Sequence, residues 1–177
     1  MSGAAGLNAY IPLFAVSVLG RAGVIQLGGP FEILTHTWAI VLISVLLLIE
    51  LVVDKIPGAD HINDLVQTII RPAAGALVFA ASTGAIKEMH PAIPVVLGLL
   101  MALSVHAAKA TARPVVNAAT LGVGAPVVSI AEDLTAVAAS VVAILAPFLV
   151  LVVALLAGYV AYRMVRRAKR RKQAKVT

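Results

Sequence analysis

Cysteine is absent from this sequence, and charged side chains are scarce, making up 12% of its 177 residues. Without cysteine, the chain has no disulfide bond, no thiol nucleophile and no thiolate ligand for a metal. In soluble domains about a quarter of the residues are charged, whereas here 61% of the residues are hydrophobic. This composition excludes an ordinary soluble domain and indicates an integral membrane protein.

In place of charge the sequence has long apolar runs. The runs from Trp38 to Val53 and from Leu134 to Tyr162 are nearly uncharged, and they approach or exceed the roughly 20 residues that a spanning helix needs. They are continuous, whereas the strands of a β-barrel alternate apolar and polar residues. We therefore expect an all-α fold, a polytopic transmembrane bundle of about six segments that forms a single domain over residues 1–162.

The expected segments differ in regularity. Asn8 and Pro12 interrupt the first, which is therefore either a broken or re-entrant helix or an interfacial entry with Tyr10 in the aromatic belt. Arg113 and Pro114 lie in the fifth, which we expect to be short, discontinuous or re-entrant. The six segments are expected at residues 3–20, 34–53, 64–82, 92–108, 111–130 and 134–164, with a loop at 21–33 and a hinge at 54–63.

The chain also divides into two candidate halves, residues 1–86 and 87–162, each with three expected spans. Two halves with an odd number of spans have opposite orientations in the membrane. Ile11 and Pro12 in the first half are echoed by Ile93 and Pro94 in the second. Inverted repeats with broken helices are typical of secondary transporters. A 3+3 inverted repeat is therefore one interpretation, and a chance echo is the other.

A strongly basic tail follows the last apolar run. Residues 163–177 contain eight basic residues and no acidic one, which by the positive-inside rule predicts a cytoplasmic C-terminus. We expect the lipid bilayer as the main partner, with anionic lipid headgroups at the tail. No aromatic residue lies among the basic ones of the tail, so we do not expect it to bind nucleic acid.

Charge gathers between Glu50 and Pro72, at the junction of two apolar segments. Charge inside a membrane is expensive, and it usually faces a bundle interior or a water-filled cavity and marks a functional path. Asp60 and His61 are the exceptions, since residues of this kind often start a helix in a solvated loop. For the other charges, a functional site and internal salt bridging remain alternatives.

The candidates for ion or substrate binding are polar residues at the ends and breaks of apolar segments. They are Asn8, Glu50, Asp54, Lys55, Asp64, Arg71, Lys109, Arg113, Asn117, Glu132 and Asp133. The carboxylates are candidate cation or proton groups, and the basic residues are candidate counter-charges or anion contacts. In the alternative interpretation, Arg71 pairs with Asp64, Glu50 or Glu132, while Glu132 and Asp133 only begin the last helix. No cofactor can be named, and whether the acids bind a metal such as Mg²⁺ stays open.

Three stretches of the sequence have a familiar pattern: GAAGLNAYIPLFAVSVLGR, IELVVDKIPGADHINDLVQTIIRPAAGAL and KATARPVVNAATLGVGAPVVSIAEDL. Together they resemble a family of small bacterial integral membrane proteins classed only as a domain of unknown function. The similarity covers nearly the whole chain apart from the basic tail. It implies a multi-helix protein of the inner membrane, and it supplies no activity, substrate or catalytic residue.

These observations favour a small transporter or channel-like protein for a small ion or polar solute. A membrane-embedded enzyme acting on a lipid phosphate or prenyl substrate is a second hypothesis, in which aspartates would hold a divalent metal and arginines a phosphate. A structural or assembly subunit of a membrane complex is a third. A chain of only 177 residues also makes a homodimer plausible, since a complete pathway through one small bundle would be tight.

Overall fold

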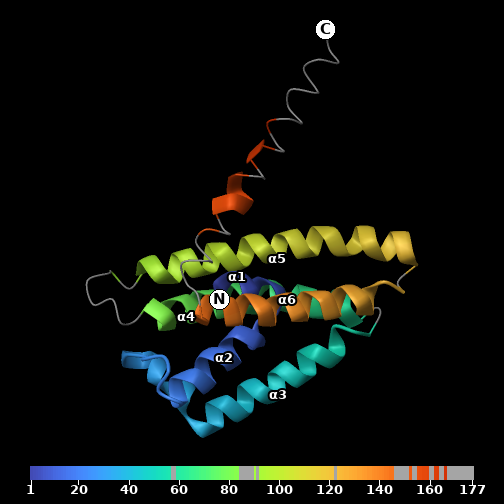
Figure 1. Cartoon of the computed structure of the whole chain (residues 1–177). Helices are drawn as coiled ribbons and strands as arrows, with labels where there is room; N and C mark the ends of the chain where they lie inside the picture. Colours follow the sequence, from blue (N-terminus) through green and yellow to red (C-terminus); the bar gives the residue numbers. More distant parts are fainter. Residues whose placement is uncertain are drawn as a thin grey trace. The chain divides into compact units, whose positions relative to one another are not determined.

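The computed structural model describes residues 1–56, 59–83, 90, 92–121, 123–145, 152, 155–159, 162, 163 and 166. The chain forms two units, Met1–Ser140 and Val141–Thr177. The described residues contain helices and no β-strand (Figure 1). In chain order the elements are α1 Ser2–Leu7, α2 Tyr10–Arg21, the 3₁₀ helix η1 Gly29–Thr35, α3 Thr37–Val53, α4 Ala59–Thr83, α5 Ala92–Thr120 and α6 Ala125–Leu145.

Three stretches of helix are long and apolar enough to cross a membrane, namely Asn63–Ser82, Ala92–Thr120 and Ala125–Leu145. The number rises to four if η1 and α3, which are bent by 68° at their junction, form one broken span. Large apolar side chains such as Leu48 and Ile69 lie exposed on the outside of the helices, where lipid replaces water. The all-α expectation is confirmed, and the chain has the helices of a multi-pass membrane protein. The number of six segments is not confirmed.

The second half of the chain is more continuous than the sequence suggested. α5 runs without a break from Ala92 to Thr120, so the separate segments expected at 92–108 and 111–130 are wrong. Pro114 removes one backbone hydrogen bond, but the helix continues through it. The chain turns instead at Leu121, Val123 and Gly124, where Leu121 has a φ of 53° and the Gly124 amide donates to Thr120 Oγ1 at 3.0 Å.

α6 therefore begins at Ala125, seven residues before Glu132. The expectation that Glu132 and Asp133 precede the last helix is wrong, because both lie in its second and third turns. The remainder of the helix predicted up to residue 164 lies mostly outside the described residues, and so does the boundary at 86/87. The inverted repeat stays a prediction.

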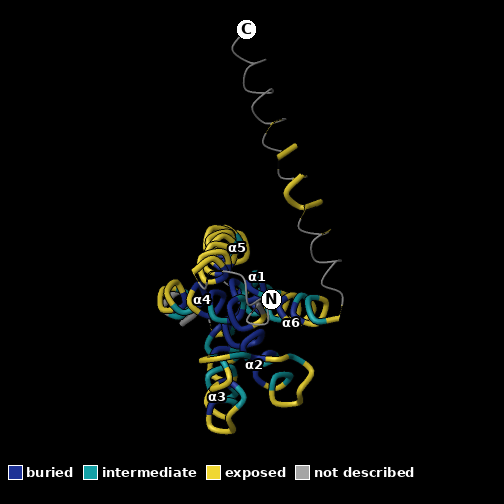
Figure 2. The backbone as a smooth tube through the Cα atoms, turned by 90° about the vertical axis from the view of Figure 1, so that its left-hand side faces the viewer, coloured by how far each residue is buried: buried dark blue, intermediate teal, exposed yellow. Residues whose placement is uncertain are grey.

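The first apolar segment is a broken helix, one of the two alternatives that the sequence offered. α1 ends at Leu7 and α2 begins at Tyr10. α1 packs against α4 and α5, whereas α2 packs against α3, η1 and α4. Buried residues gather where these helices converge (Figure 2). The break therefore lies inside the helical unit and not at its edge.

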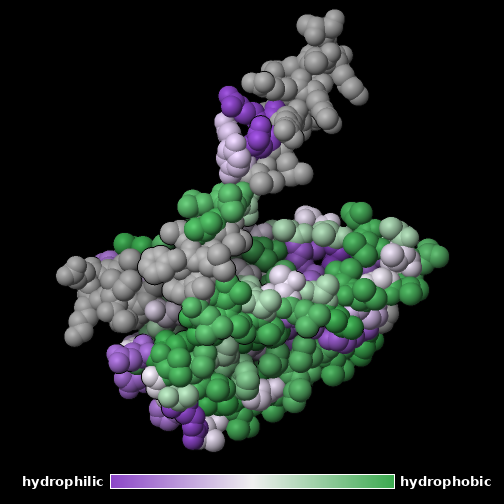
Figure 3. Space-filling view, in the orientation of Figure 1, coloured by the Kyte–Doolittle hydropathy of each residue, from purple (hydrophilic) through white to green (hydrophobic). Residues whose placement is uncertain are grey.

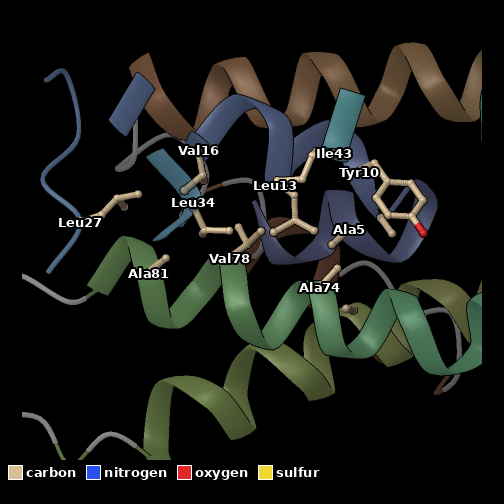
Figure 4. Close-up of a cluster of buried hydrophobic side chains, with 12 residues drawn as sticks. Ala5, Tyr10, Leu13, Val16, Leu27, Leu34, Ile43, Ala74, Val78 and Ala81 are labelled. Atoms are coloured by element: carbon tan, nitrogen blue, oxygen red, sulfur yellow. The ribbon is translucent and has the colours of Figure 1, made fainter. Parts of the chain in front are cut away.

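The apolar core of the first unit lies between α1, α2, α3 and α4 (Figure 4). Val16 from α2 and Val78 from α4 are fully buried in it, and Ile43 from α3 completes the contact. Tyr10 lies at one end of this cluster, with its hydroxyl oxygen directed away from the apolar side chains. The apolar core thus ends at Tyr10.

α4 and α5 approach each other at glycines, as small-residue helix packing in membranes requires. A Cβ at Gly75 would collide with the side chain of Ala102 and would lie 2.8 Å from the carbonyl oxygen of Gly98. A Cβ at Gly98 would in turn meet the carbonyl oxygen of Gly75. This contact sets how closely the charged faces of the two helices can face each other.

The second unit is described at few residues. Helical residues are found at 152, 155–159, 162, 163 and 166. Within it, the guanidinium carbon of Arg163 lies 5.7 Å from the ring centre of Tyr159, and that of Arg166 lies 5.7 Å from the ring centre of Tyr162. Most of the basic tail at 163–177 lies outside the described residues, so its role at the membrane remains an expectation.

We predict that Gly75→Ala destabilises the protein, because the new methyl group overlaps Ala102 on α5. Overpacking of this kind costs about 1–3 kcal/mol. Gly3→Ala is the matched control, since its Cβ would have only an ordinary contact at 3.8 Å, with Val105 Cγ2. Both changes add an alanine to a helix. A thermal midpoint in detergent that falls for Gly75→Ala and not for Gly3→Ala is expected, and equal midpoints would contradict the close approach.

Candidate functional site

Two helices supply the first four charges of the candidate site. Glu50 and Asp54 are one helical turn apart at the C-terminal end of α3, and each is 1% exposed. Asp64 and Arg71 are seven residues apart on α4, which places them on one face. Arg71 is completely buried. The helix spacing thus brings two acids from α3 against an acid and a cation from α4.

α5 and α6 complete the set. His106, Lys109 and Arg113 are the buried polar residues of α5, at a spacing of three and four residues that defines one face. Glu132 and Asp133 come from the interior of α6. Because α5 is continuous and α6 begins early, these residues reach the acids of α3 and α4.

Asp54 is the centre of the arrangement. Its Oδ2 lies 3.1 Å from Arg113 Nη2, 3.2 Å from Lys109 Nζ and 3.6 Å from Arg71 Nη2. Its other oxygen, Oδ1, accepts a hydrogen bond from Asn63 Nδ2 at 2.6 Å. One carboxylate therefore connects cations from both α4 and α5.

Arg71 connects three acids. Its Nη2 donates to Glu50 Oε1 at 3.0 Å and lies close to Asp54, while its Nη1 donates to Asp64 Oδ1 at 3.2 Å. The structure therefore gives Arg71 two of the partners that the salt-bridge interpretation named, Glu50 and Asp64. Glu132, the third, pairs with other cations.

Glu132 binds the two cations of α5. Its Oε2 lies 2.7 Å from Arg113 Nη2 and 2.9 Å from Lys109 Nζ. Arg113 Nη1 also donates to Asp64 Oδ2 at 3.3 Å. We use the term central network for these seven residues: Glu50, Asp54, Asp64, Arg71, Lys109, Arg113 and Glu132.

The broken first helix is tied to the central network. At the break, Lys109 Nζ donates to the carbonyl oxygen of Leu7 at 3.0 Å. Asn8 Oδ1 accepts from the amides of Tyr10 and Ile11, each at 3.1 Å, and so starts α2. Asn8 Nδ2 donates to Asp133 Oδ1 at 3.0 Å. The backbone groups freed by the break are thus satisfied by polar side chains, as a break at membrane depth requires.

A peripheral ion pair lies next to Asn8. Lys55 Nζ is 3.0 Å from Asp133 Oδ2, and it also donates to the carbonyl oxygen of Leu51 at 2.7 Å. The Lys55 side chain is 34% exposed, the most of any charged residue in these pairs. This pair is electrically balanced, so it does not change the net charge of the central network.

His106 of α5 connects Arg71 and Thr68 of α4 without carrying charge. Arg71 Nη1 is 3.2 Å from His106 Nδ1, and because arginine can only donate, Nδ1 is the acceptor. The neutral ring then has its proton on Nε2, which donates to Thr68 Oγ1 at 3.1 Å. The hydroxyl of Thr68 in turn donates a hydrogen bond to the backbone carbonyl oxygen of Asp64 at 2.8 Å. His106 is therefore a neutral connector in this arrangement.

Several buried polar atoms of the described residues have no hydrogen-bond partner. Three of them belong to neighbours within or beside the central network: Glu50 Oε2, Arg71 Nε and Gln67 Oε1. Gln67 is one turn from Arg71 on α4 and is 3% exposed. Orphaned polar atoms in a buried position cost free energy unless a further group satisfies them.

The central network opens toward the surface on one side. Asp64 and Glu132 are 14% and 13% exposed, whereas Glu50, Asp54 and Arg71 are almost fully buried. Figure 3 shows a mainly hydrophobic surface with a hydrophilic strip just below α5. The buried end of the network, at Glu50, and its more open end, at Asp64 and Glu132, therefore have different access to solvent.

Ten of the eleven candidate residues are brought together in these contacts. Asn117 is the exception, since it lies one turn beyond Arg113 on α5, is half-buried, and has a contact other than those described above. The side chains of Asp60 and His61 lie outside the described part of the chain. Within that part, no group of three or more histidine or acidic side chains is arranged to hold a metal ion.

Asn63, Gln67 and the linking role of His106 were not predicted from the sequence. Asn63 and Gln67 are uncharged, so a search for charge in apolar segments passes over them. Their spacing was nevertheless a signal, because Gln67 lies between Asp64 and Arg71 at helical intervals of three and four residues. His106 precedes Lys109 by three residues, which places both on one face of α5.

The fold and the network together define an all-helical, multi-pass membrane protein with a buried ionic centre. The family described as "Domain of unknown function (DUF4126)" matches residues 1–167, so the chain belongs to that family. No curated protein and no solved structure shows significant similarity to the chain. The resemblance to a family classed as a domain of unknown function is confirmed.

We predict that Asp54→Asn strongly destabilises the protein. The change removes the charge on which Arg113, Lys109 and Arg71 converge, and breaking a buried ionic contact costs about 3–5 kcal/mol. Glu32→Gln is the control, because it makes the same charge change at an exposed residue of η1. Denaturant unfolding in detergent measures both, and similar losses for the two variants would contradict a central role for Asp54.

Proposed function

We propose that this protein is a transporter or channel-like protein for a small ion or polar solute, and that the central network is its intramembrane site. One observation carries the proposal: seven ionisable side chains from four helices meet between those helices, which are apolar enough to span a membrane. Such groups are rare in membranes and mark ion, proton or substrate paths.

The broken helix supports the same proposal. Secondary transporters often bind their cargo where an interrupted helix exposes backbone groups, and here the carbonyl oxygen of Leu7 faces Lys109. The direct tie between the break and Lys109 means that a change in the network's contacts acts on the orientation of α1 relative to α2. A 3+3 inverted repeat belongs to this proposal as its expected architecture.

A structural or assembly subunit is the second candidate, and it also has an observation in its favour. Each of the seven network residues has at least one partner of opposite charge within 4 Å. A network in which every charge is paired can act purely as a tie between helices. The two candidates predict different behaviour for a variant that alters the network but still folds. If the network only holds the helices together, such a variant keeps its function. If the network is a transport site, the variant loses its function.

The first test is flux into vesicles containing the purified protein, with protons, sodium, potassium and chloride as the probes. We expect flux of at least one probe above that of protein-free vesicles. Arg71→Lys keeps the charge but loses the forked contact that reaches Glu50 and Asp64 with different nitrogens. We therefore expect this variant to lose most of the flux, whereas its thermal midpoint falls by less than that of Asp54→Asn because the positive charge is kept.

Glu32→Gln, at an exposed position, is the control and should keep wild-type flux. Absence of flux for all four ions in the wild type contradicts a path for small ions, and full flux in a folded Arg71→Lys variant contradicts the central network as the site. A variant in which flux and midpoint fall together to the same degree favours the structural candidate.

The proposal includes a location and partners. We place the protein in the bacterial inner membrane with the basic tail in the cytoplasm, where anionic lipid headgroups would contact it. A second copy of the chain is a further proposed partner, and nucleic acid is not one.

The chain's lack of cysteine makes the orientation easy to test. We predict that a Lys172→Cys variant in intact cells is labelled by a membrane-impermeant thiol reagent only after the membrane is opened, because residue 172 would lie in the cytoplasm. The wild-type chain, which has no thiol, gives the background. Labelling from outside in intact cells would reverse the orientation.

A further inference from the structure

The central network does not balance electrically. Four carboxylates, Glu50, Asp54, Asp64 and Glu132, face three cations in the described part of the chain. His106 is neutral in its contacts, and the pair of Lys55 and Asp133 adds no net charge. With every acid ionised, the network has one negative charge in excess. In an apolar environment that excess is costly, and uptake of one proton removes it.

The excess charge is least compensated at Glu50. Asp54 and Asp64 each have three cations within 4 Å, and Glu132 has two. Among the described side chains, Glu50 has only Arg71 at that distance, and Arg71 binds one of its two oxygens. Glu50 is 1% exposed, as is Asp54, but Asp54 has three cations to offset the cost of its burial. A proton therefore relieves more repulsion and desolvation there than at the other acids.

The second oxygen of Glu50 has no partner. Glu50 Oε2, Gln67 Oε1 and Arg71 Nε are all buried and unsatisfied. Arg71 binds Glu50 directly, and Gln67 is one turn from Arg71 on the same helix. Two acceptors and one donor are thus left in a single neighbourhood. A water molecule or a proton on Oε2 is complementary to this set, since either one provides a hydrogen-bond donor for the unsatisfied acceptors.

The groups that face Glu50 come from four helices. Tyr10 on α2, Arg71 on α4 and Lys109 on α5 interact electrostatically with it, as does Asp54 on its own helix. The hydroxyl of Tyr10 points out of the apolar cluster in Figure 4. His106 does not compete for the proton, because its Nδ1 already accepts from Arg71.

We propose that Glu50 is the proton-binding group of this protein, and that Gln67 and Arg71 form with it a site for one proton and one water molecule. A proton from solvent adds to Oε2, the carboxylate becomes a carboxylic acid, and the charge of the central network goes from minus one to zero. The water donates to one free acceptor and accepts from Arg71 Nε. The role of this proton in coupling rests on the proposed transport function, but its binding does not.

The decisive measurement is an infrared difference spectrum of the purified protein between acidic and alkaline solution. We expect the band of a protonated carboxylic acid whose hydrogen-bonding is that of a buried group. Glu50→Gln should remove this band, and Glu32→Gln should leave it in place. Glu50→Gln should also keep the wild-type thermal midpoint, because an amide reproduces the shape of the neutral acid and can still accept from Arg71 and donate to Gln67.

Gln67→Leu is the second variant, and it changes no charge. It removes the free acceptor beside Glu50, so the acid band should remain but move to the frequency of a more weakly hydrogen-bonded acid. The inference is overturned if the band persists in Glu50→Gln, if no such band is present in the wild type, or if Gln67→Leu leaves it unmoved.

Flux experiments separate this inference from the proposed function. In vesicles, wild-type flux should respond to a pH gradient and the flux of Glu50→Gln should not. A protein that transports none of the probe ions but loses its acid band in Glu50→Gln contradicts the proposed function and keeps the proton site. A protein whose flux and acid band are both indifferent to Glu50→Gln contradicts the proton site and keeps the proposed function.

Discussion

The contact between Asp54 and the three cations around it is the interaction on which the rest of this structure depends. Lys109 and Arg113 come from α5, and Arg71 comes from α4. Asp64 lies within 4 Å of the same three cations but is more exposed, so Asp54 is the fully buried carboxylate that separates these three positive charges. With Asp54 in place, the close glycine contact between α4 and α5 brings the cations of both helices within reach of one carboxylate. Packing and electrostatics therefore specify the same helix arrangement.

The sequence predicted the kind of fold well because bilayer solvation leaves few choices. A continuous apolar run has to be helical to satisfy its backbone, and Asn8 was a good marker of the break in the first helix. Prediction failed where one local signal was given too much weight. Pro114 costs α5 a single hydrogen bond, which a long apolar helix with many other bonds can tolerate, so the proline marked no boundary.

The site was predictable residue by residue but not pair by pair. The four-residue spacing of Glu50 and Asp54 places both on one helix face, and the expense of a buried Arg71 required an acidic partner. The pairing of Glu132 with Lys109 and Arg113 was not foreseeable, because it depends on α6 beginning at Ala125 and on α5 continuing past its proline. Gln67 was missed because it is neutral, although its position between Asp64 and Arg71 put it on the same face.

The imbalance of the central network bears on whether its charges are ties or working groups. A tie gains nothing from an extra carboxylate, since a buried ionic network barely repays its desolvation even when balanced. A balanced set of three acids and three cations, with a neutral side chain at position 50, would hold the helices at least as well. A group that alternates between charged and neutral forms, by contrast, must be an acid that the surrounding cations do not fully compensate. Glu50, with one bound oxygen and one free, meets that requirement, and the three other acids do not.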